Sequence, residues 1–390
     1  MGRTEGRLGF FLSKAFRAYT LKVYLRGSKS LTILFSRLLK NLKYITALRF
    51  PLAVLVVLIH SYNSAWRTTG HEALTGWGTF CSQTLPTFAV PLFFAISGYL
   101  FFAHMPEFSL SAYTEKLRRR VHTLLVPYVA WNVVAFLLYA AKDWAAHAAL
   151  QHPLSFNLLW GDTQMSSAGT NFLGWTVQAA TAPVQEPLWF VRDLIILVLL
   201  SPIIYWIIKH LRWASIAILA VVYYLHLWPN PCGMSAMGWW FFSLGAWFAI
   251  EGKDPLKATQ SLLRPCAAML LPLLILQVLL PDRSGWGFAL AQQLYVLSAM
   301  ICAIHVANSF SRRWVPAEVV SQSSFFIYAS HVIVLSPLTA ALAKASVGQD
   351  AIAQIAGYLL CPALAVGTCL FAYAVLTKFF PKAFSPLLGR

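Results

Sequence analysis

The sequence predicts an all-α protein whose helices cross a lipid bilayer about ten times. Of its 390 residues, 58% are hydrophobic and only 11% are charged, and the mean hydropathy is +0.63. Soluble domains carry roughly 25% charged residues, so this chain has too little polar surface to be soluble. The 15 Trp and 15 Tyr residues fit membrane–water interfaces, where both types are enriched. A transmembrane β-barrel would instead show alternating segments of ~10 residues, which do not dominate here.

Apolar runs divide the chain into segments of about 20 residues, the length that a helix needs to cross the hydrocarbon core. We predict ten spans, at 45–63, 80–103, 122–141, 188–208, 213–228, 236–251, 265–281, 287–308, 322–341 and 353–377. Residues 1–43 form a basic extension, for which a membrane-surface helix and a disordered arm are both open interpretations. Residues 44–390 form the membrane domain. Its outer loop at 142–187 is long, and loops of this length are usually functional or partly structured.

The basic residues predict the orientation of these spans. With the N-terminus in the cytoplasm, 24 of the 30 Lys and Arg residues fall on the cytoplasmic side, and the positive-inside rule then places both termini there. The net charge of +17 lies in short loops between apolar runs, so it indicates topology, and no nucleic acid partner is predicted. None of the six Cys residues lies in a C-x-x-C pair, and no metal site is predicted.

Two polar side chains in the first span are not needed for membrane insertion. The run RFPLAVLVVLIH begins with Arg49 and ends with His60, eleven residues further along the chain. Eleven residues are about three helical turns, so both side chains point to one face, roughly 16 Å apart along the axis. Such a face should turn towards protein or a hydrated cavity. The alternative is that Arg49 reaches the cytoplasmic headgroups and His60 lies at the outer interface.

Further polar groups lie in or beside later spans. A group of basic residues at 116–120 precedes the third span. These residues either signal topology and bind anionic lipid or hold the phosphates of a ligand. In the second span, Ser97-Gly98-Tyr99 supplies small residues that allow another helix to approach closely. The basic group consists of Lys116, Arg118, Arg119 and Arg120.

The predicted outer end of the fourth span carries Glu186, Trp189, Arg192 and Asp193, which would border the mouth of a cavity. Adjacent residues do not face each other on a helix, so Arg192 and Asp193 are each expected to find a partner elsewhere. The ninth span buries Tyr328 and His331 on one face. A second intramembrane histidine besides His60 favours a functional cavity over isolated helix–helix bonds.

Together these motifs resemble the acyltransferase 3 family, the multi-spanning bacterial membrane acyltransferases that modify cell-surface carbohydrates. The resemblance covers most of 44–390. It rests on ITALRFPLAVLVVLIH, VPLFFAISGYLF, KLRRRVHTLLVPYVAW, PLWFVRDLIILVLLSPI, WWFFSLGAWF, SSFFIYASHVIV and FPKAFSPLLGR, in this order. The Arg-x10-His pair of the family falls on Arg49 and His60, and its SGY motif on Ser97-Gly98-Tyr99. The Arg-x-x-Arg motif of some members has no match in register, which leaves open which basic side chain does its work.

The resemblance implies a ten-helix core in a bacterial inner membrane, a cytoplasmic acyl-CoA donor, above all acetyl-CoA, and a glycan or lipid-linked sugar acceptor outside. We expect His60 to act as the general base, since the unperturbed pKa of an imidazole is about 6.5. Arg49 and the basic group at 116–120 are expected to hold the donor. The oxyanion is expected to receive a hydrogen bond from Tyr328, His331 or Ser97.

The acceptor is expected to contact Trp189, Glu186, Arg192, Asp193 and Ser97. Transfer through an acyl-histidine or acyl-serine is an open alternative to direct transfer. Two other functions are alternatives as well. One is a transporter or flippase for a lipid-linked sugar; the other is a membrane acyltransferase that modifies a lipid or a protein.

Overall fold

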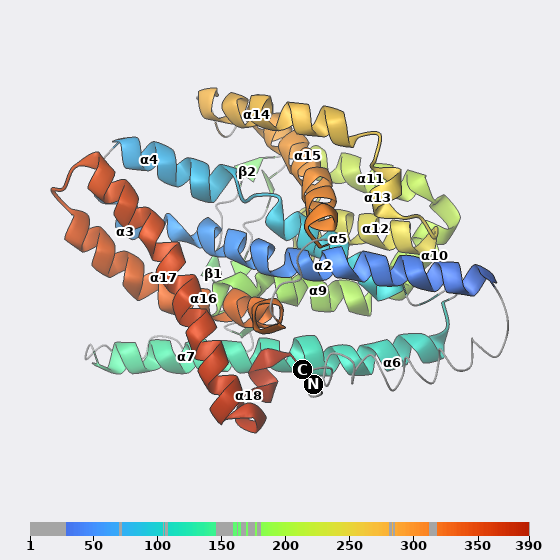
Figure 1. The fold of residues 1–390 in the computed structure, drawn as a ribbon, viewed down its shortest axis with the longest axis horizontal. Coiled ribbons are helices and arrows are strands. Elements are labelled where there is room, and N and C mark those ends of the chain that lie inside the picture. Colours follow the sequence, from blue (N-terminus) through green and yellow to red (C-terminus); the bar gives the residue numbers. More distant parts are fainter. Residues whose placement is uncertain are drawn as a thin grey trace, which may run out of the picture.

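The computed structural model describes residues 29–69, 72–103, 105, 108–145, 159–161, 163–164, 169–170, 176–177, 181–280, 283, 285–311 and 318–389. Helices make up nearly all of this part of the chain (Figure 1). The first half contains α2 (Lys29–Ser61), α3 (Ser64–Arg67), α4 (Glu72–Thr79), the π-helix η1 (Phe80–Thr84), α5 (Ala89–Phe102), α6 (Leu110–Arg120), the π-helix η2 (Val121–Leu125) and α7 (Val126–Ala145). The second half contains the 3-10 helix η3 (Glu186–Leu188), α9 (Trp189–Leu199), α10 (Ser201–Leu211), α11 (Trp213–Tyr224), α12 (Ala236–Ile250), α13 (Pro255–Ala258), α14 (Leu263–Leu279), α15 (Trp286–Ser311), α16 (Glu318–Ser346), α17 (Ala351–Phe379) and α18 (Pro381–Leu388).

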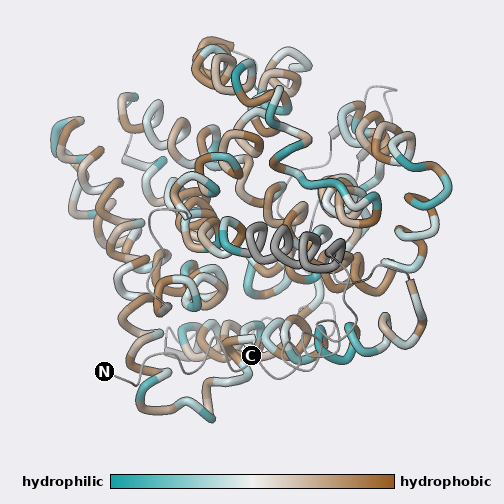
Figure 2. Tube along the Cα trace, turned by 45° about the vertical axis from the view of Figure 1, so that its right-hand side comes forward, coloured by the Kyte–Doolittle hydropathy of each residue, from teal (hydrophilic) through white to brown (hydrophobic). Residues whose placement is uncertain are grey.

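The apolar helices confirm an all-α polytopic membrane protein. Six helical stretches are long and apolar enough to cross a membrane, and α9 with α10 forms a bent seventh. Three shorter apolar helices, α11, α12 and α14, complete the set. Each of the ten predicted spans coincides with one of these units. Figure 2 shows hydrophobic residues along most of the helices, as a lipid environment requires.

Several helices extend beyond the predicted spans. Helix α2 begins at Lys29, so residues 29–43 continue the helix of the first span, while residues 1–28 of the predicted extension lie outside the described residues. Helices α6, η2 and α7 follow one another without a break from 110 to 145. A sequence-based boundary stops at the charged residues, but a helix continues into water wherever its backbone bonds are satisfied.

The fourth span is broken rather than straight. Helices α9 and α10 meet at an angle of 65°, and Pro202 lies in the first turn of α10. Proline lacks a backbone N–H and its ring clashes with the preceding turn, so the α9 helix ends at this point. The bend turns the predicted cytoplasmic half of the span away from the axis of its outer half.

Helix α2 runs through the middle of the bundle (Figure 1) and contacts α5, α15, α16 and α17. Leu52, Ala53, Val56 and Val57 on this helix are buried against its neighbours. Because α2 is surrounded by other helices, much of its surface faces protein rather than lipid. His60 on this helix is therefore half-buried inside the bundle, whereas Arg49, nearer the predicted cytoplasmic side, is exposed.

The described part of the outer loop contains two short antiparallel ribbons. Strand β1 (Thr163–Gln164) pairs with β4 (Thr181–Ala182), and β2 (Gly169–Thr170) pairs with β3 (Thr176–Val177). The second ribbon is nested inside the first in the sequence. The loop thus has secondary structure of its own, as its length predicts.

Helices α5 and α12 approach each other closely at two glycines. A Cβ atom on Gly98 would lie 2.0 Å from the carbonyl oxygen of Phe242, and one on Gly245 would lie 1.9 Å from the carbonyl oxygen of Ala95. No side chain fits between these backbones. The small residues of the SGY motif therefore serve the predicted close contact of two helices.

Replacement of Gly98 by Ala should force α5 and α12 apart, because the clash is with backbone and not with a movable side chain. Overpacking of this kind costs ~1–3 kcal/mol, so the apparent melting temperature of the purified protein in detergent should fall clearly. Gly367 in α17 is the matched control, since its added Cβ would meet no atom within 4 Å. Equal melting temperatures for Gly98→Ala and Gly367→Ala would contradict the packing argument.

Candidate functional site

The two intramembrane histidines meet where α2 packs against α16. The ring centroids of His60 and His331 are 5.2 Å apart, with an angle of 51° between the ring planes. His331 has no exposed surface, and His60 is half-buried. The sequence prediction that His60 turns inward is confirmed, and the histidine of the ninth span is its direct neighbour.

The hydrogen bonds of His331 define its protonation. Its Nδ1 atom lies 2.7 Å from the carbonyl oxygen of Tyr328 and 3.2 Å from that of Ile327. A carbonyl oxygen only accepts hydrogen bonds, so Nδ1 must carry the proton. The Nε2 atom is buried and has no hydrogen-bond partner among the described residues. In the neutral ring, this nitrogen presents a lone pair.

A carboxylate approaches this histidine pair from η3. Glu186 lies within electrostatic range of His60 and also of Tyr139, which is on α7. Both Glu186 and Tyr139 are exposed. The outer end of the site therefore offers a solvated carboxylate and a phenol next to a half-buried imidazole.

The segment that carries Glu186 is fixed on both sides. The Nε2 atom of Gln185 donates to the carbonyl oxygen of Ala329 on α16 at 2.6 Å, and its backbone N–H donates to Oδ1 of Asn132 on α7 at 3.0 Å. The hydroxyl of Tyr328 donates to the carbonyl oxygen of Pro187. Tyr328 is therefore occupied in holding this segment, and its phenol is not free to bond an oxyanion.

Gln185 and Asn132 are not among the residues that the sequence predicts for the site. Both side chains are fully buried. The available signal was a lone amide in each of two stretches: YVAWNVVAF, which is otherwise apolar, and VQEPLWF, whose other polar residue is Glu186. A polar side chain in such a stretch needs a hydrogen-bond partner, which makes it a candidate for fixing neighbouring elements.

The part of α2 around Arg49, on the predicted cytoplasmic side of the first span, has a different character. Arg49 is exposed, and Arg120, at the end of α6, lies within electrostatic range of it. Neither guanidinium forms an ion pair or hydrogen bond within the described part of the chain. Two cations within electrostatic range of each other favour an anion nearby, and guanidinium groups suit phosphate by geometry.

The rest of the basic group is directed elsewhere. The Nζ atom of Lys116 donates to the carbonyl oxygen of Phe101 and lies 5.1 Å from the centroid of the Phe101 ring, so it ties α6 to the end of α5. Arg119 forms an exposed ion pair with Glu115 on its own helix. Arg118 is exposed. Of the four basic residues predicted to bind the donor, the structure brings Arg120 to Arg49; donor binding by the others stays a prediction.

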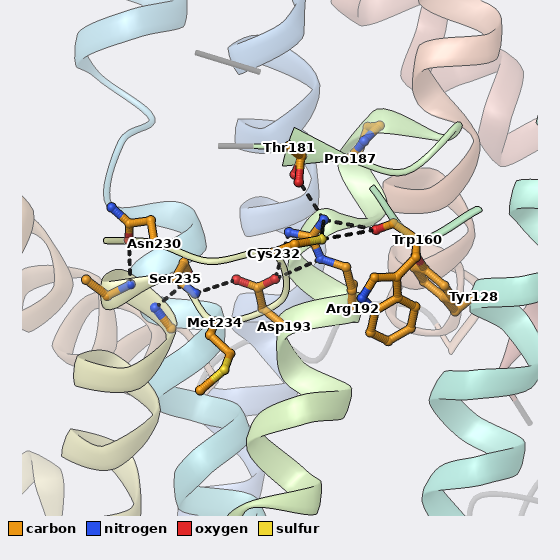
Figure 3. A network of polar contacts seen from close by, with 12 residues as sticks. Tyr128, Trp160, Thr181, Pro187, Arg192, Asp193, Asn230, Cys232, Met234 and Ser235 are labelled. Atoms are coloured by element: carbon orange, nitrogen blue, oxygen red, sulfur yellow. Dashed lines mark hydrogen bonds and ion pairs between the residues drawn. The ribbon is translucent and has the colours of Figure 1, made fainter. Parts of the chain in front are cut away.

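The expectation for Arg192 and Asp193 was wrong in one respect, because the two side chains do pair with each other. Nε and Nη2 of Arg192 donate to Oδ1 of Asp193 at 3.1 and 3.0 Å (Figure 3). Both residues are buried. The rule that neighbours do not face each other holds for the surface of an isolated helix. Here the long arginine side chain folds back over the carboxylate, since burial leaves no solvent to take its place.

The pair also ties the outer loops to α9. Nη1 of Arg192 donates to the carbonyl oxygens of Trp160 and Thr181, both at 3.0 Å, and to the sulfur of Cys232. Oδ2 of Asp193 accepts from the backbone N–H of Ser235, the N-cap of α12 (Figure 3). Every nitrogen of the guanidinium has a partner, so this geometry favours a structural role; contact with an acceptor stays a prediction.

The two remaining predicted residues lie on α9 and α5, which contact each other, and α5 also contacts α2. Trp189, the first residue of α9, is half-buried, and its ring centroid lies 6.2 Å from that of Phe94. Ser97 on α5 is half-buried and forms no hydrogen bond within the described residues. Their predicted contacts with an acceptor or an oxyanion are not tested by this geometry.

Comparison with known proteins gives two matches. The sequence profile of the acyltransferase 3 family, described as "Acyltransferase domain", matches residues 42–377. The chain is also similar to the succinoglycan biosynthesis protein ExoH of Rhizobium meliloti (strain 1021), with 28% identity over 229 residues. That alignment covers 57% of this chain and 58% of ExoH, which is less than two thirds of the relative. No solved structure matches the chain.

Removal of one partner of the buried Arg192–Asp193 pair should lower the stability of the protein. Arg192→Met or Asp193→Leu leaves one charge uncompensated, which costs ~3–5 kcal/mol, whereas the double variant removes both charges and should recover part of this loss. A double-mutant cycle on the apparent melting temperature in detergent measures the coupling. The exposed pair Arg119–Glu115 is the control, with an expected coupling of ~0–1 kcal/mol. Strictly additive losses at Arg192 and Asp193 would show that the two charges do not act as a unit.

Proposed function

Since the chain belongs to the acyltransferase 3 family, we propose that it transfers an acetyl group from cytoplasmic acetyl-CoA to a hydroxyl of a cell-surface or lipid-linked carbohydrate. The site of action would be a bacterial inner membrane. Family membership favours this activity over the transporter alternative. The observation that carries the proposal is that α2 places Arg49, within electrostatic range of Arg120, three turns before His60, which lies beside His331 of α16.

The spacing on α2 suits a long, two-ended donor. Arg49 and His60 are about 16 Å apart along the helix axis, since each residue adds 1.5 Å. In acetyl-CoA, the extended pantetheine arm separates the thioester from the phosphates by a distance of the same order. Arg49 and Arg120 would hold phosphate oxygens, while the thioester carbonyl would lie beside His60. Arg49 is thus a donor-binding residue in this proposal and not a group that contacts the reacting carbonyl.

The chemistry at the outer end is a general-base acyl transfer. His60 takes the proton of the acceptor hydroxyl while the hydroxyl oxygen attacks the thioester carbonyl carbon. The tetrahedral intermediate collapses, the C–S bond breaks, and the CoA thiolate takes the proton from the His60 imidazolium. One ester bond forms, one thioester bond breaks, and the imidazole is regenerated. A neutral imidazole is a suitable base because its unperturbed pKa of about 6.5 lies close to physiological pH.

The proposed acceptor class is supported by the outer end of the site and by the relative. ExoH is named for the biosynthesis of succinoglycan, which is consistent with a carbohydrate acceptor. Trp189 and Tyr139 supply aromatic surface and Glu186 supplies a carboxylate on the predicted outer side. Hydroxyl-rich sugars bind through such combinations of ring faces and hydrogen-bond acceptors.

The direct test is mass spectrometry of surface polysaccharide and glycolipid from cells with and without this protein. We expect a mass increase equal to one or more acetyl groups only when the protein is present. Identical masses in both fractions would refute acyl transfer to a glycan. A different mass increment would keep the reaction class but replace acetyl by another acyl group.

Replacement of His60 by Ala should lower acetylation by ~10²–10⁴-fold, which is the usual contribution of a general base. The measurement uses inverted membrane vesicles supplied with [14C]acetyl-CoA, with label counted in extracted polysaccharide and lipid. His122→Ala is the matched control, because His122 is exposed at η2. Undiminished transfer by His60→Ala, at equal protein in the membrane, would eliminate it as the base.

Replacement of Arg120 by Gln should raise the KM for acetyl-CoA by about 10- to 100-fold with a smaller change in kcat, because a charge-assisted hydrogen bond contributes ~1.5–3 kcal/mol. Arg264→Gln removes the same charge from an exposed position of α14, on the predicted cytoplasmic side, and should leave KM unchanged. An inverted topology of Arg120→Gln with normal acetyl-CoA affinity would instead support a role in orientation alone.

A further inference from the structure

We propose that His331 is a positioning residue whose Nε2 lone pair accepts a hydrogen bond from a ring N–H of His60, and so determines which nitrogen of His60 faces the acceptor. This inference rests on the proposed function of His60 as the base. It differs from the sequence-based expectation, in which His331 was a candidate donor to the oxyanion.

The tautomer of His331 is fixed by its backbone neighbours. Two backbone carbonyl oxygens, from Ile327 and Tyr328, lie 3.2 and 2.7 Å from its Nδ1 atom. Both are acceptors, so the proton resides on Nδ1 and the neutral ring has none on Nε2. A neutral His331 therefore has no N–H left to donate to an oxyanion. It is restricted to accepting.

Nε2 of His331 is isolated both from solvent and from hydrogen-bond donors of the described residues. The side chain of His331 is fully buried, and Nε2 has no partner among the described residues. A buried acceptor without a hydrogen bond is unfavourable, so a nearby donor is needed. Bulk water does not reach the atom. The donor must then come from a neighbouring side chain or from a molecule that enters the site.

The neighbouring donor is His60. The ring of His60 has its centroid 5.2 Å from the ring of His331. An N–H···N bond with nitrogens about 2.9 Å apart places two imidazole centroids roughly 5 Å apart. Rotation of the half-buried His60 ring that directs an N–H at Nε2 of His331 would form this bond. The fixed ring is the acceptor and the freer ring is the donor.

This arrangement gives each nitrogen of His60 a defined task. With one N–H held by His331, the other nitrogen of the neutral ring presents a lone pair, and it takes the hydroxyl proton. The resulting imidazolium keeps its first proton in the bond to His331 and passes the second to the CoA thiolate. His331 itself gains and loses no proton. Its effect matches that of the acceptor that orients the base in a catalytic triad, where the wrong tautomer is inactive.

Glu186 is the other group that faces His60, and it is an alternative acceptor. It lies within electrostatic range of His60 but is exposed, so water competes for its oxygens. His331 is buried and fixed by its own hydrogen bonds. The rigid acceptor defines a tautomer better than the solvated one, and Glu186→Gln is therefore included in the test.

The test compares two replacements of His331, each of which retains the hydrogen-bonding group of a different ring nitrogen. In His331→Gln, the side-chain oxygen can occupy the place of Nε2 and still accept from His60. In His331→Asn, the side-chain N–H can replace the bond to Tyr328, but nothing reaches the place of Nε2. Both variants change the packing, so a purely structural role predicts similar losses. The assay uses full-length protein in inverted vesicles with [14C]acetyl-CoA.

We expect His331→Gln to keep kcat within about tenfold of the wild type and His331→Asn to lose ~100-fold or more, with the KM for acetyl-CoA unchanged in both. Equal kcat values for the two variants would overturn the proposal. A loss in Glu186→Gln as large as that in His331→Asn, with His331→Gln no better than His331→Asn, would assign the positioning role to Glu186.

A spectroscopic measurement separates this inference from the proposed function. Solid-state NMR of 15N-histidine-labelled protein in lipid should show a neutral ring with protonated Nδ1 and unprotonated Nε2, whose signals vanish in His331→Gln. A ring with the opposite tautomer at this position would refute the inference whatever the activity. If the wild type transfers no acetyl group while this tautomer is observed, the proposed function fails and the geometry of the pair stands.

Discussion

The position of α2 follows from the cost of placing ionisable side chains in hydrocarbon. Arg49 and His60 share one face of a helix that crosses the membrane, and neither is stable against lipid. That face must meet protein or water, which places α2 in the middle of the bundle and not at its edge. The other helices then pack around it. His331 on α16 and Arg120 at the end of α6 are brought to the two ends of the same face.

Two kinds of polar group are distinguished by their bonds. Arg192, Asp193 and Lys116 use their polar atoms in contacts with the chain itself, and these contacts hold loops and helix ends in place. Nε2 of His331, in contrast, is buried and has no bonded partner among the described residues, and Arg49 and Arg120 form no ion pair there. A folded protein seldom leaves such groups unsatisfied without a use for them. The second kind therefore outlines the proposed reaction path, and the first kind outlines its support.

The sequence predicted the membrane fold well and the site in part. Ten apolar runs and the inward orientation of His60 are properties of local periodicity, which a single sequence contains. The partners of Arg192, namely the carbonyl groups at 160 and 181, come from loops remote in the sequence, and no periodicity reveals them. The helix rule for neighbours then gave the wrong expectation for Asp193. The roles of Gln185 and Asn132 were missed for the same reason, since each becomes apparent only with its partner from another helix.

The rigidity of α2 connects the two ends of the proposed reaction. The helix runs on from Arg49 to His60, with Pro51 inside it, and so relates the distance and the direction of the two side chains. One element would therefore carry both the phosphate-binding and the thioester-binding residue of the proposed donor site. A single residue inserted between them would turn His60 by about 100° away from α16 while hardly changing the distance. The direction in which the His60 side chain points from α2 is thus specified as strictly as its position along the helix axis. Because His331 lies on a different helix, the packing of α2 against α16 brings the base and its neighbour together. The hydrogen bond from Gln185 to Ala329 attaches the segment that carries Glu186 to the same helix, α16. The geometry of the proposed acyl transfer is therefore a property of helix packing and not of any loop.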